Sequence, residues 1–157
     1  MKFVFLSAFV LLSSAACADE SRELWNFTQR FLKDFPDHSK SAADVAGAHF
    51  AATPVFYIGQ MPGFDTSPEL GAKMVEIYRE QFCVDSHPFT AFDIENQAVG
   101  ADGSAAVLVA FRRPSAPDPR LKDFCNILSL AKLNGDWKIM TWFIYGLSAR
   151  DCSHQNF

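Results

Sequence analysis

The clearest pattern of hydrophobic residues runs from Asp123 to Gly146, where two long apolar runs flank the pair Asn134-Gly135. Asn-Gly favours a two-residue hairpin turn, because both central residues of a type I′ turn need a positive φ. The pattern therefore predicts two long antiparallel strands. A turn closed by Leu133 and Asp136 gives the pairs Ala131–Lys138, Leu130–Ile139, Ile127–Trp142, Asn126–Phe143 and Cys125–Ile144.

Both faces of this predicted hairpin are largely apolar. One face carries Phe124, Asn126, Leu128, Leu130, Trp137, Ile139, Thr141, Phe143 and Tyr145. The other carries Cys125, Ile127, Ala131, Met140, Trp142 and Ile144. An antiparallel sheet that is apolar on both faces must be covered twice, once by the chain's own helices and once by something else.

Helical periodicity comes before the strands. Apolar residues recur every three or four positions from Glu23 to Phe35, and Ser41-Ala42-Ala43-Asp44 resembles a capping box that opens a short helix to about Phe50. A third helix starts with Ser67 as N-cap and Pro68 at its first position. Shorter strands are predicted at 54–58, 89–99 and 104–112. This order predicts an α+β fold with the helices on one face of a curved sheet.

The first residues have the pattern of a secretory signal peptide. A single cation, Lys2, precedes an apolar run over 3–12, and small residues at Ala16 and Ala18 predict cleavage after Ala18. The apolar run is shorter than the ~20 residues that a membrane anchor needs. Lipid attachment at Cys17 is the bacterial alternative. We expect residues 1–18 to be the signal peptide and 19–157 to form one domain, secreted or periplasmic.

The amino-acid composition limits the classes of binding partner that we expect. The formal net charge is −4, which argues against nucleic acids and anionic membrane surfaces. Sixteen Phe residues predict a thick aromatic core or an apolar cavity lining. No spacing of the cysteines indicates a metal site, and we expect no cofactor. Asn26-Phe27-Thr28 is a glycosylation sequon, and helical spacing places Asn26 opposite the apolar stripe.

Three cysteines follow the predicted cleavage point: Cys83, Cys125 and Cys152. An odd number in an oxidising compartment allows at most one internal disulfide. A meander of strands would gather all three at one end of the sheet. We expect the pair Cys83–Cys152, because both lie outside the strands whereas Cys125 alternates into one.

The runs HFAATPVFYIGQMPGF, LGAKMVEIYREQF and LNGDWKIMTWFI follow the layout of the nuclear transport factor 2-like superfamily, which includes ketosteroid isomerase, scytalone dehydratase and polyketide cyclase-like domains. The most specific piece is Asn134-Gly135-Asp136-Trp137-Lys138-Ile139, similar to the family's Gly-x-Trp-x-Ile. The resemblance implies a cone-shaped, mostly antiparallel sheet wrapped around three helices, with an apolar pocket between them. It also implies a homodimer through the outer sheet face, so that replacing Trp142 by Glu should break the dimer and leave the fold intact.

Family enzymes place carboxylates, Tyr or His at the pocket, and the resemblance offers Asp93, Tyr57 and His49 as catalytic candidates. Burial of Asp93 in a cavity would raise its pKa toward that of a general base. Each residue also has a plainer interpretation: Asp93 exposed on the opposite side from Phe92 and Ile94, His49 at a helix end, and Tyr57 in the core.

The ligand-facing candidates lie on the first face of the hairpin: Asn126, Thr141, Phe143, Tyr145 and Phe124. A buried Asn126 must find partners, so it belongs either to a hydrogen-bond network or to a ligand site. Two functions remain open. One is a domain that binds a small apolar molecule or serves as a dimeric scaffold; the other is a cofactor-independent isomerase, dehydratase or cyclase that works by general acid and base.

Overall fold

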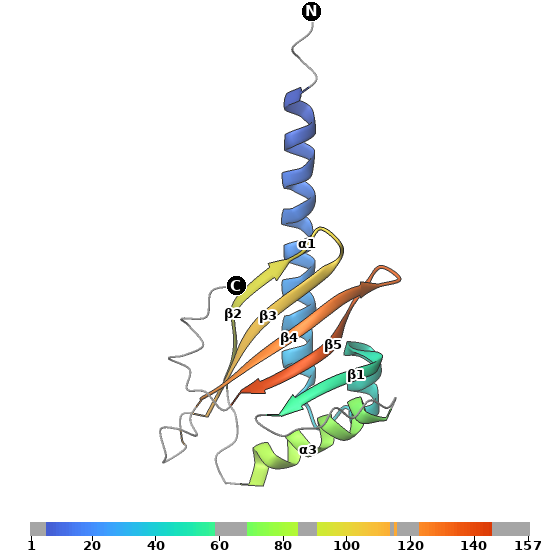
Figure 1. Ribbon diagram of the computed structural model, residues 1–157. Helices are drawn as coiled ribbons and strands as arrows, with labels where there is room; N and C mark the ends of the chain where they lie inside the picture. The colour runs from blue at the N-terminus through green and yellow to red at the C-terminus, as the bar shows by residue number, and fades with distance from the viewer. Residues whose placement is uncertain (1–5, 59–68, 85–90, 114, 116–122, 146–157) are drawn as a thin grey trace, which may run out of the picture.

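The computed structural model describes residues 6–58, 69–84, 91–113, 115 and 123–145, with side chains for all of these except 6–17, 57–58, 81–84, 123 and 144–145. The elements follow the predicted order of helix, helix, strand, helix and four strands (Figure 1). They are α1 (Leu6–Asp34), α2 (Ala42–His49), β1 (Phe50–Ile58), α3 (Leu70–Val84), β2 (Ala91–Val99), β3 (Ser104–Arg112), β4 (Asp123–Leu133) and β5 (Asp136–Tyr145).

The five strands form one curved sheet in the order β1-β5-β4-β3-β2. Strands β2 to β5 make an antiparallel meander, and β1 joins its far edge parallel to β5. Helix α1 crosses one face of the sheet, and α2 and α3 lie beyond the β1 edge (Figure 1). The predicted α+β fold, with a mostly antiparallel curved sheet around three helices, is confirmed.

Helix α1 presents the predicted apolar stripe to the sheet. Leu24, Phe27, Phe31, Leu32 and Phe35 are all buried, and they recur at the spacing that keeps side chains on one helix face. The helix begins earlier than predicted, at Leu6 instead of Glu23. In the described part of the chain, no helix is both long and apolar enough to cross a membrane.

The β4–β5 turn has the predicted backbone geometry, with φ of 53° at Asn134 and 91° at Gly135. The first pairs also match the prediction, including Ala131 with Lys138 and Leu130 with Ile139. A β-bulge at Met140 then shifts the ladder by one residue, so that Thr141 faces Ser129. Because side chains alternate along a strand, this shift exchanges the two faces of β5 beyond the bulge. The predicted pairs Ile127–Trp142, Asn126–Phe143 and Cys125–Ile144 are therefore wrong.

Trp142 shows the result of this exchange. Its side chain is 1% exposed and lies at the centre of the core beneath α1. Its ring packs against Phe31, Phe35 and Tyr78, with centroids 5.3 to 5.6 Å apart. The expectation that Trp142 lies at a dimer interface is wrong, because the bulge turns it inward.

The outer face of the sheet carries a second, smaller apolar cluster of Leu108, Ala110 and Cys125, with Ile127 packed against it. Cys125 is itself disulfide-bonded, so our expectation that it stays outside the bridge is wrong. The side chains of Cys83 and Cys152 lie outside the described residues, and their pairing stays a prediction. Alternation into a strand did not exclude Cys125, because it lies two residues from the start of β4.

Candidate functional site

A histidine–aspartate pair joins the ends of the first two helices. Asp34 is the last residue of α1, His49 is the last residue of α2, and His49 Nε2 lies 3.0 Å from Asp34 Oδ2. Lys40 Nζ donates to the other carboxylate oxygen at 2.6 Å. His49 was predicted as a candidate; Asp34 was not, because the apolar stripe of α1 gives no sign that its last turn meets α2.

The His49 ring is 4% exposed and lies edge-on to Phe27 and Phe31, with centroids 5.5 Å from each. Burial lowers the pKa of His49, and the nearby cations Lys138 and Arg30 lower it further, while Asp34 opposes the shift. Neutral His49 then donates its Nε2 proton to Asp34. Its Nδ1 is buried and has no hydrogen-bond partner among the described residues.

Asp34 has the opposite electrostatic balance. Desolvation raises the pKa of its carboxyl, but the hydrogen bonds from Lys40 and His49 outweigh this effect and lower the pKa. The pair at neutral pH is therefore a carboxylate beside a neutral imidazole whose ring is held in one orientation. Such a pair can position a base or lock two helices together.

Two cations hold the ends of these helices in place. Arg79 of α3 is 7% exposed and donates to the backbone oxygens of Asp34, Phe35, Asp37 and Lys40, at 2.6 to 3.1 Å. Lys138 of β5 donates to the oxygens of Gly47 and Ala48 at the end of α2, at 3.0 and 2.7 Å. Arg79 binds carbonyl oxygens at and just after the end of α1, and Lys138 binds those in the last turn of α2, at helix ends where the dipole favours positive charge.

Asn126 belongs to a hydrogen-bond network inside the core. It is 2% exposed, its Oδ1 accepts a hydrogen bond from Trp142 Nε1 at 2.8 Å, and its Nδ2 donates to Phe124 O at 3.2 Å. The two polar groups satisfy each other in a place that water does not reach. Of the two readings left open by the sequence, the network explains Asn126.

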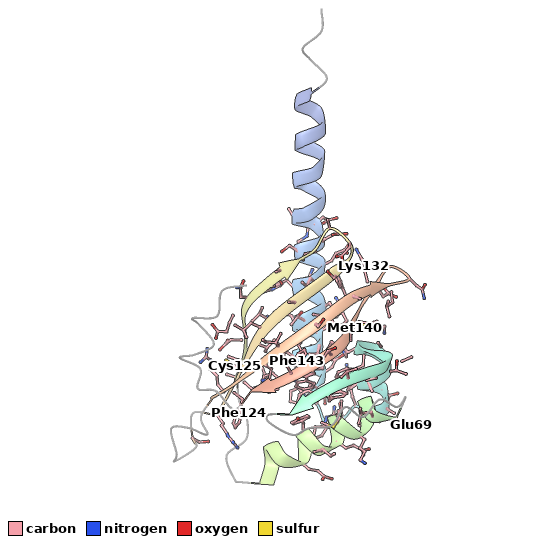
Figure 2. All side chains as sticks on the ribbon, in the orientation of Figure 1. Glu69, Phe124, Cys125, Lys132, Met140 and Phe143 are labelled. Atoms are coloured by element: carbon pink, nitrogen blue, oxygen red, sulfur yellow. The ribbon has the colours of Figure 1, made fainter. Side chains whose placement is uncertain are left out.

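The other predicted residues do not converge on one point. Asp93 is 53% exposed at its side chain and pairs with Arg112 at 2.6 Å, so the interpretation of an exposed Asp93 is confirmed and that of a base buried in a cavity is wrong. Thr141 and Phe143 alternate with Trp142 beyond the bulge, so they lie on the opposite face of β5; Phe143 is labelled in Figure 2. Phe124 is partly buried, with the Arg113 guanidinium 5.1 Å from its ring centroid. The side chains of Tyr57 and Tyr145 lie outside the described residues.

A hollow of about 710 Å³ lies between α2, the start of α3 and the β4–β5 turn. Small side chains make up most of its wall: Ala43, Ala46, Gly47, Ala51, Ala52, Gly71 and Ala72. Phe50 and the 40% exposed Leu133 add apolar surface, and Glu69, Asn134, Asp136 and Lys138 provide polar groups.

A second groove, of about 480 Å³, lies between α1 and the same turn. Its lining consists of Glu23, Asn26, Phe27, Arg30, Ala48, Gly135, Asp136, Trp137 and Lys138. This groove is more polar than the hollow, and it passes next to the His49 pair through Phe27 and Ala48. Among the described residues, no three His, Cys, Asp or Glu side chains are grouped as metal ligands would be.

Comparison with known proteins identifies the fold. A protein described as NTF-2-like and of unknown function from Silicibacter pomeroyi superimposes with a TM-score of 0.57 at 12% identity, over 82% of this chain and 96% of its own. A second such protein from Shewanella baltica gives 0.53 at 14% identity, over 77% and 91%. The chain has the nuclear transport factor 2-like fold. No family model matches the sequence, and no curated protein matches it either.

A third structure, a protein of unknown function with a cystatin-like fold from Nostoc punctiforme, gives a TM-score of 0.57 at 16% identity over 79% of this chain and 88% of its own. At these identities the likeness establishes the fold alone. In this nuclear transport factor 2-like chain, Trp142 and its aromatic neighbours fill the described space between sheet and helices. The two hollows described above lie at the rim of the cone, on either side of Lys138.

Proposed function

We propose that this chain is a binding domain that holds a small, largely apolar molecule in the hollow between α2, α3 and the β4–β5 turn. The observation that carries the proposal is the wall of alanine and glycine residues around a volume of about 710 Å³. This volume is in the range of small-molecule sites, which combine apolar walls with a few polar groups. Lys138 and Asn134 at its edge suit a ligand that has one polar end.

Gly47 provides the test, because a Cβ atom built there meets no atom within 4 Å. Gly47→Leu should occupy part of the hollow, since its Cβ meets no atom, and it should also favour the helix, in which glycine costs about 1 kcal/mol. Gly47→Ala is the matched control, since it gains the same helix propensity and leaves the hollow open. The probe is 1-anilinonaphthalene-8-sulfonate, followed by fluorescence.

We expect Gly47→Leu to weaken binding of the probe at least tenfold and Gly47→Ala to leave it unchanged. Native mass spectrometry of protein purified without denaturation would show whether a molecule is retained, and Gly47→Leu should lose it. Equal affinity of all three proteins for the probe would rule out the hollow as the binding site.

The His49–Asp34 pair favours a second candidate function, that of a cofactor-independent isomerase, dehydratase or cyclase. The carboxylate orients the ring, and Nδ1 carries the lone pair that could accept a proton. Conversion of a cyclic β,γ-unsaturated ketone, followed by ultraviolet absorbance, would test this. His49→Gln should lose the activity at least a hundredfold, whereas His38→Gln, at an exposed position, should not. An unchanged rate in His49→Gln would refute the enzymatic role.

We further propose that the chain is exported and that residues 1–18 are removed. The pattern of Lys2, an apolar run and Ala18 supports this proposal. Expression in a secreting host followed by N-terminal sequencing of the exported protein should give Asp19 as the first residue. A product that stays in the cell and begins at Met1 would contradict it.

A further inference from the structure

The sequon Asn26-Phe27-Thr28 lies within α1, and its residues face different ways. Asn26 is exposed, as predicted from helical spacing. Thr28 is 0% exposed, and its hydroxyl donates to Leu24 O at 3.0 Å. In the folded protein the acceptor amide is therefore accessible, whereas the threonine hydroxyl that completes the sequon is enclosed and already bonded.

Asn26 also lies on the rim of the groove between α1 and the β4–β5 turn. Two acidic and two basic side chains line this groove, Glu23 and Asp136 against Arg30 and Lys138, so neither sign of charge dominates. In the described structure, Asn26, Arg30 and Asp136 make no side-chain hydrogen bond or ion pair. A groove of this kind offers both donors and acceptors to a neutral ligand.

Trp137 adds an unpartnered donor to the groove wall. Its side chain lines the groove together with residues of α1 and is only 5% exposed, and its indole N–H has no hydrogen-bond acceptor among the described residues. A buried donor without a partner is unusual in folded proteins, and a ligand oxygen would satisfy it. Sugars match this combination, because their hydroxyl groups both donate and accept and their carbon faces pack on aromatic walls such as Phe27.

We propose that Asn26 carries an N-linked glycan whose first sugar lies in this groove, against Trp137, Arg30 and Asp136. Attachment at the rim holds the sugar at an effective concentration of about millimolar, so contacts too weak to bind a free sugar suffice. Because the Thr28 hydroxyl is enclosed in the folded helix, the glycan is added before α1 packs on the sheet.

The first experiment tests the timing of attachment. Purified, unglycosylated protein is given to an oligosaccharyltransferase with a lipid-linked oligosaccharide, either folded or after unfolding in urea followed by dilution. We expect mass spectrometry to find the glycan on Asn26 only in the unfolded sample. A folded protein modified at the same rate would overturn the enclosed-threonine inference, and no modification in either state would overturn the site.

The second experiment tests where the sugar lies, using protein secreted from a eukaryotic host. The glycosylated wild type should melt about 4 °C above the same protein trimmed by N-glycosidase, as a modest stabilisation of a domain of this size would give. Arg30→Ala should remove this difference. Lys33→Ala should keep it, because Lys33 is an exposed cation on the same helix but not in the groove lining.

A direct readout distinguishes a bound sugar from general glycan effects. With ¹³C-labelled N-acetylglucosamine, nuclear Overhauser contacts to the Trp137 indole should appear in the glycosylated wild type. A titration of the unglycosylated protein with free N-acetylglucosamine tests whether the groove binds free sugar or only the sugar attached to Asn26. Saturation below millimolar concentration would assign the groove to free sugar and overturn the proposal, as would a glycosylated protein with no Trp137 contacts.

Discussion

Replacing Asn126 by Leu would test directly whether this residue supports the fold or faces a ligand. Leu has the same branched arrangement of four side-chain heavy atoms as Asn, so the change leaves no cavity on the inner face of β4. It removes the acceptor for Trp142 Nε1, which lies 2.8 Å from Asn126 Oδ1 in a site that is 1–2% exposed. A buried donor left without a partner costs about 1–3 kcal/mol. Part of this loss is offset by the added apolar side chain, and we expect a net loss of about 1–2 kcal/mol.

Trp142→Phe removes the donor instead and also leaves unfilled volume among the surrounding rings. We expect a loss of about 2–4 kcal/mol, because the volume term adds to the unsatisfied Asn126 oxygen. In the double variant both polar partners are gone. The two losses should then fall short of additive by about 1–2 kcal/mol, which is the coupling of a direct hydrogen bond.

Urea denaturation followed by circular dichroism provides the four free energies of unfolding. Thr141→Val, on the outer face of the same hairpin, is the control and should change stability by less than about 0.5 kcal/mol. Additivity of Asn126→Leu and Trp142→Phe within about 0.4 kcal/mol would refute the hydrogen-bond network. If Asn126→Leu were as stable as the wild type but bound the apolar probe more weakly, Asn126 would be a ligand-contacting residue and not a structural one.

Three more perturbations follow from the site. Arg79→Met should cost about 3 kcal/mol in urea denaturation, since it leaves carbonyl oxygens at the end of α1 without their buried donor; a loss under about 0.5 kcal/mol would show that water replaces the guanidinium freely. The pKa of His49 is lowered from its ordinary 6.5 on folding, so its stabilising contribution is complete above that value and is lost as the pH falls toward the folded pKa. His49→Phe should therefore flatten the fall in unfolding free energy on acidification below about pH 6.5, and identical pH profiles would contradict this reasoning. We propose a homodimer through the outer face at Ile127: Ile127→Glu should give a monomer in light scattering, whereas Trp142→Glu should unfold the chain, and an Ile127→Glu variant that stayed dimeric would place the interface elsewhere.

Local sequence was enough to predict the elements and half of the hairpin. Asn134-Gly135 determined the turn, and the pairs next to it followed by counting. The bulge at Met140 was not predictable in this way, because Ile139, Met140 and Trp142 are all apolar and no glycine or proline marks the extra residue. If the pairing of β5 with β4 shifts by one residue, both faces of the strand are still largely apolar. Only packing against α1 decides which face takes the larger ring.

The candidate site is formed by contacts between segments that are distant in the sequence. The hydrophobic periodicity within one helix or strand does not indicate which other segment it meets. Asp34 and His49 are each the last residue of a helix, and their meeting depends on how α1 and α2 are joined. Nothing in the sequence around Arg79 indicates a partner, yet its side chain reaches four carbonyls more than thirty positions earlier in the chain. For Asp93 the alternation along the strand was informative. Phe92 and Ile94 were expected to point inward, which leaves Asp93 on the exposed side of β2, where the structure has it.

The parallel pairing of β1 with β5 has a consequence for the order of folding. The meander from β2 to β5 uses neighbouring strands, so it can form from local contacts, whereas β1 must pair with residues such as Trp142 that lie more than eighty positions later. During synthesis the N-terminal segment emerges first and has no sheet to join until the last strand is complete. Helix α1 and its sequon emerge earlier still, before every strand on which the helix packs. The topology sets a time window in which enzymes that act on unfolded chains can reach this segment.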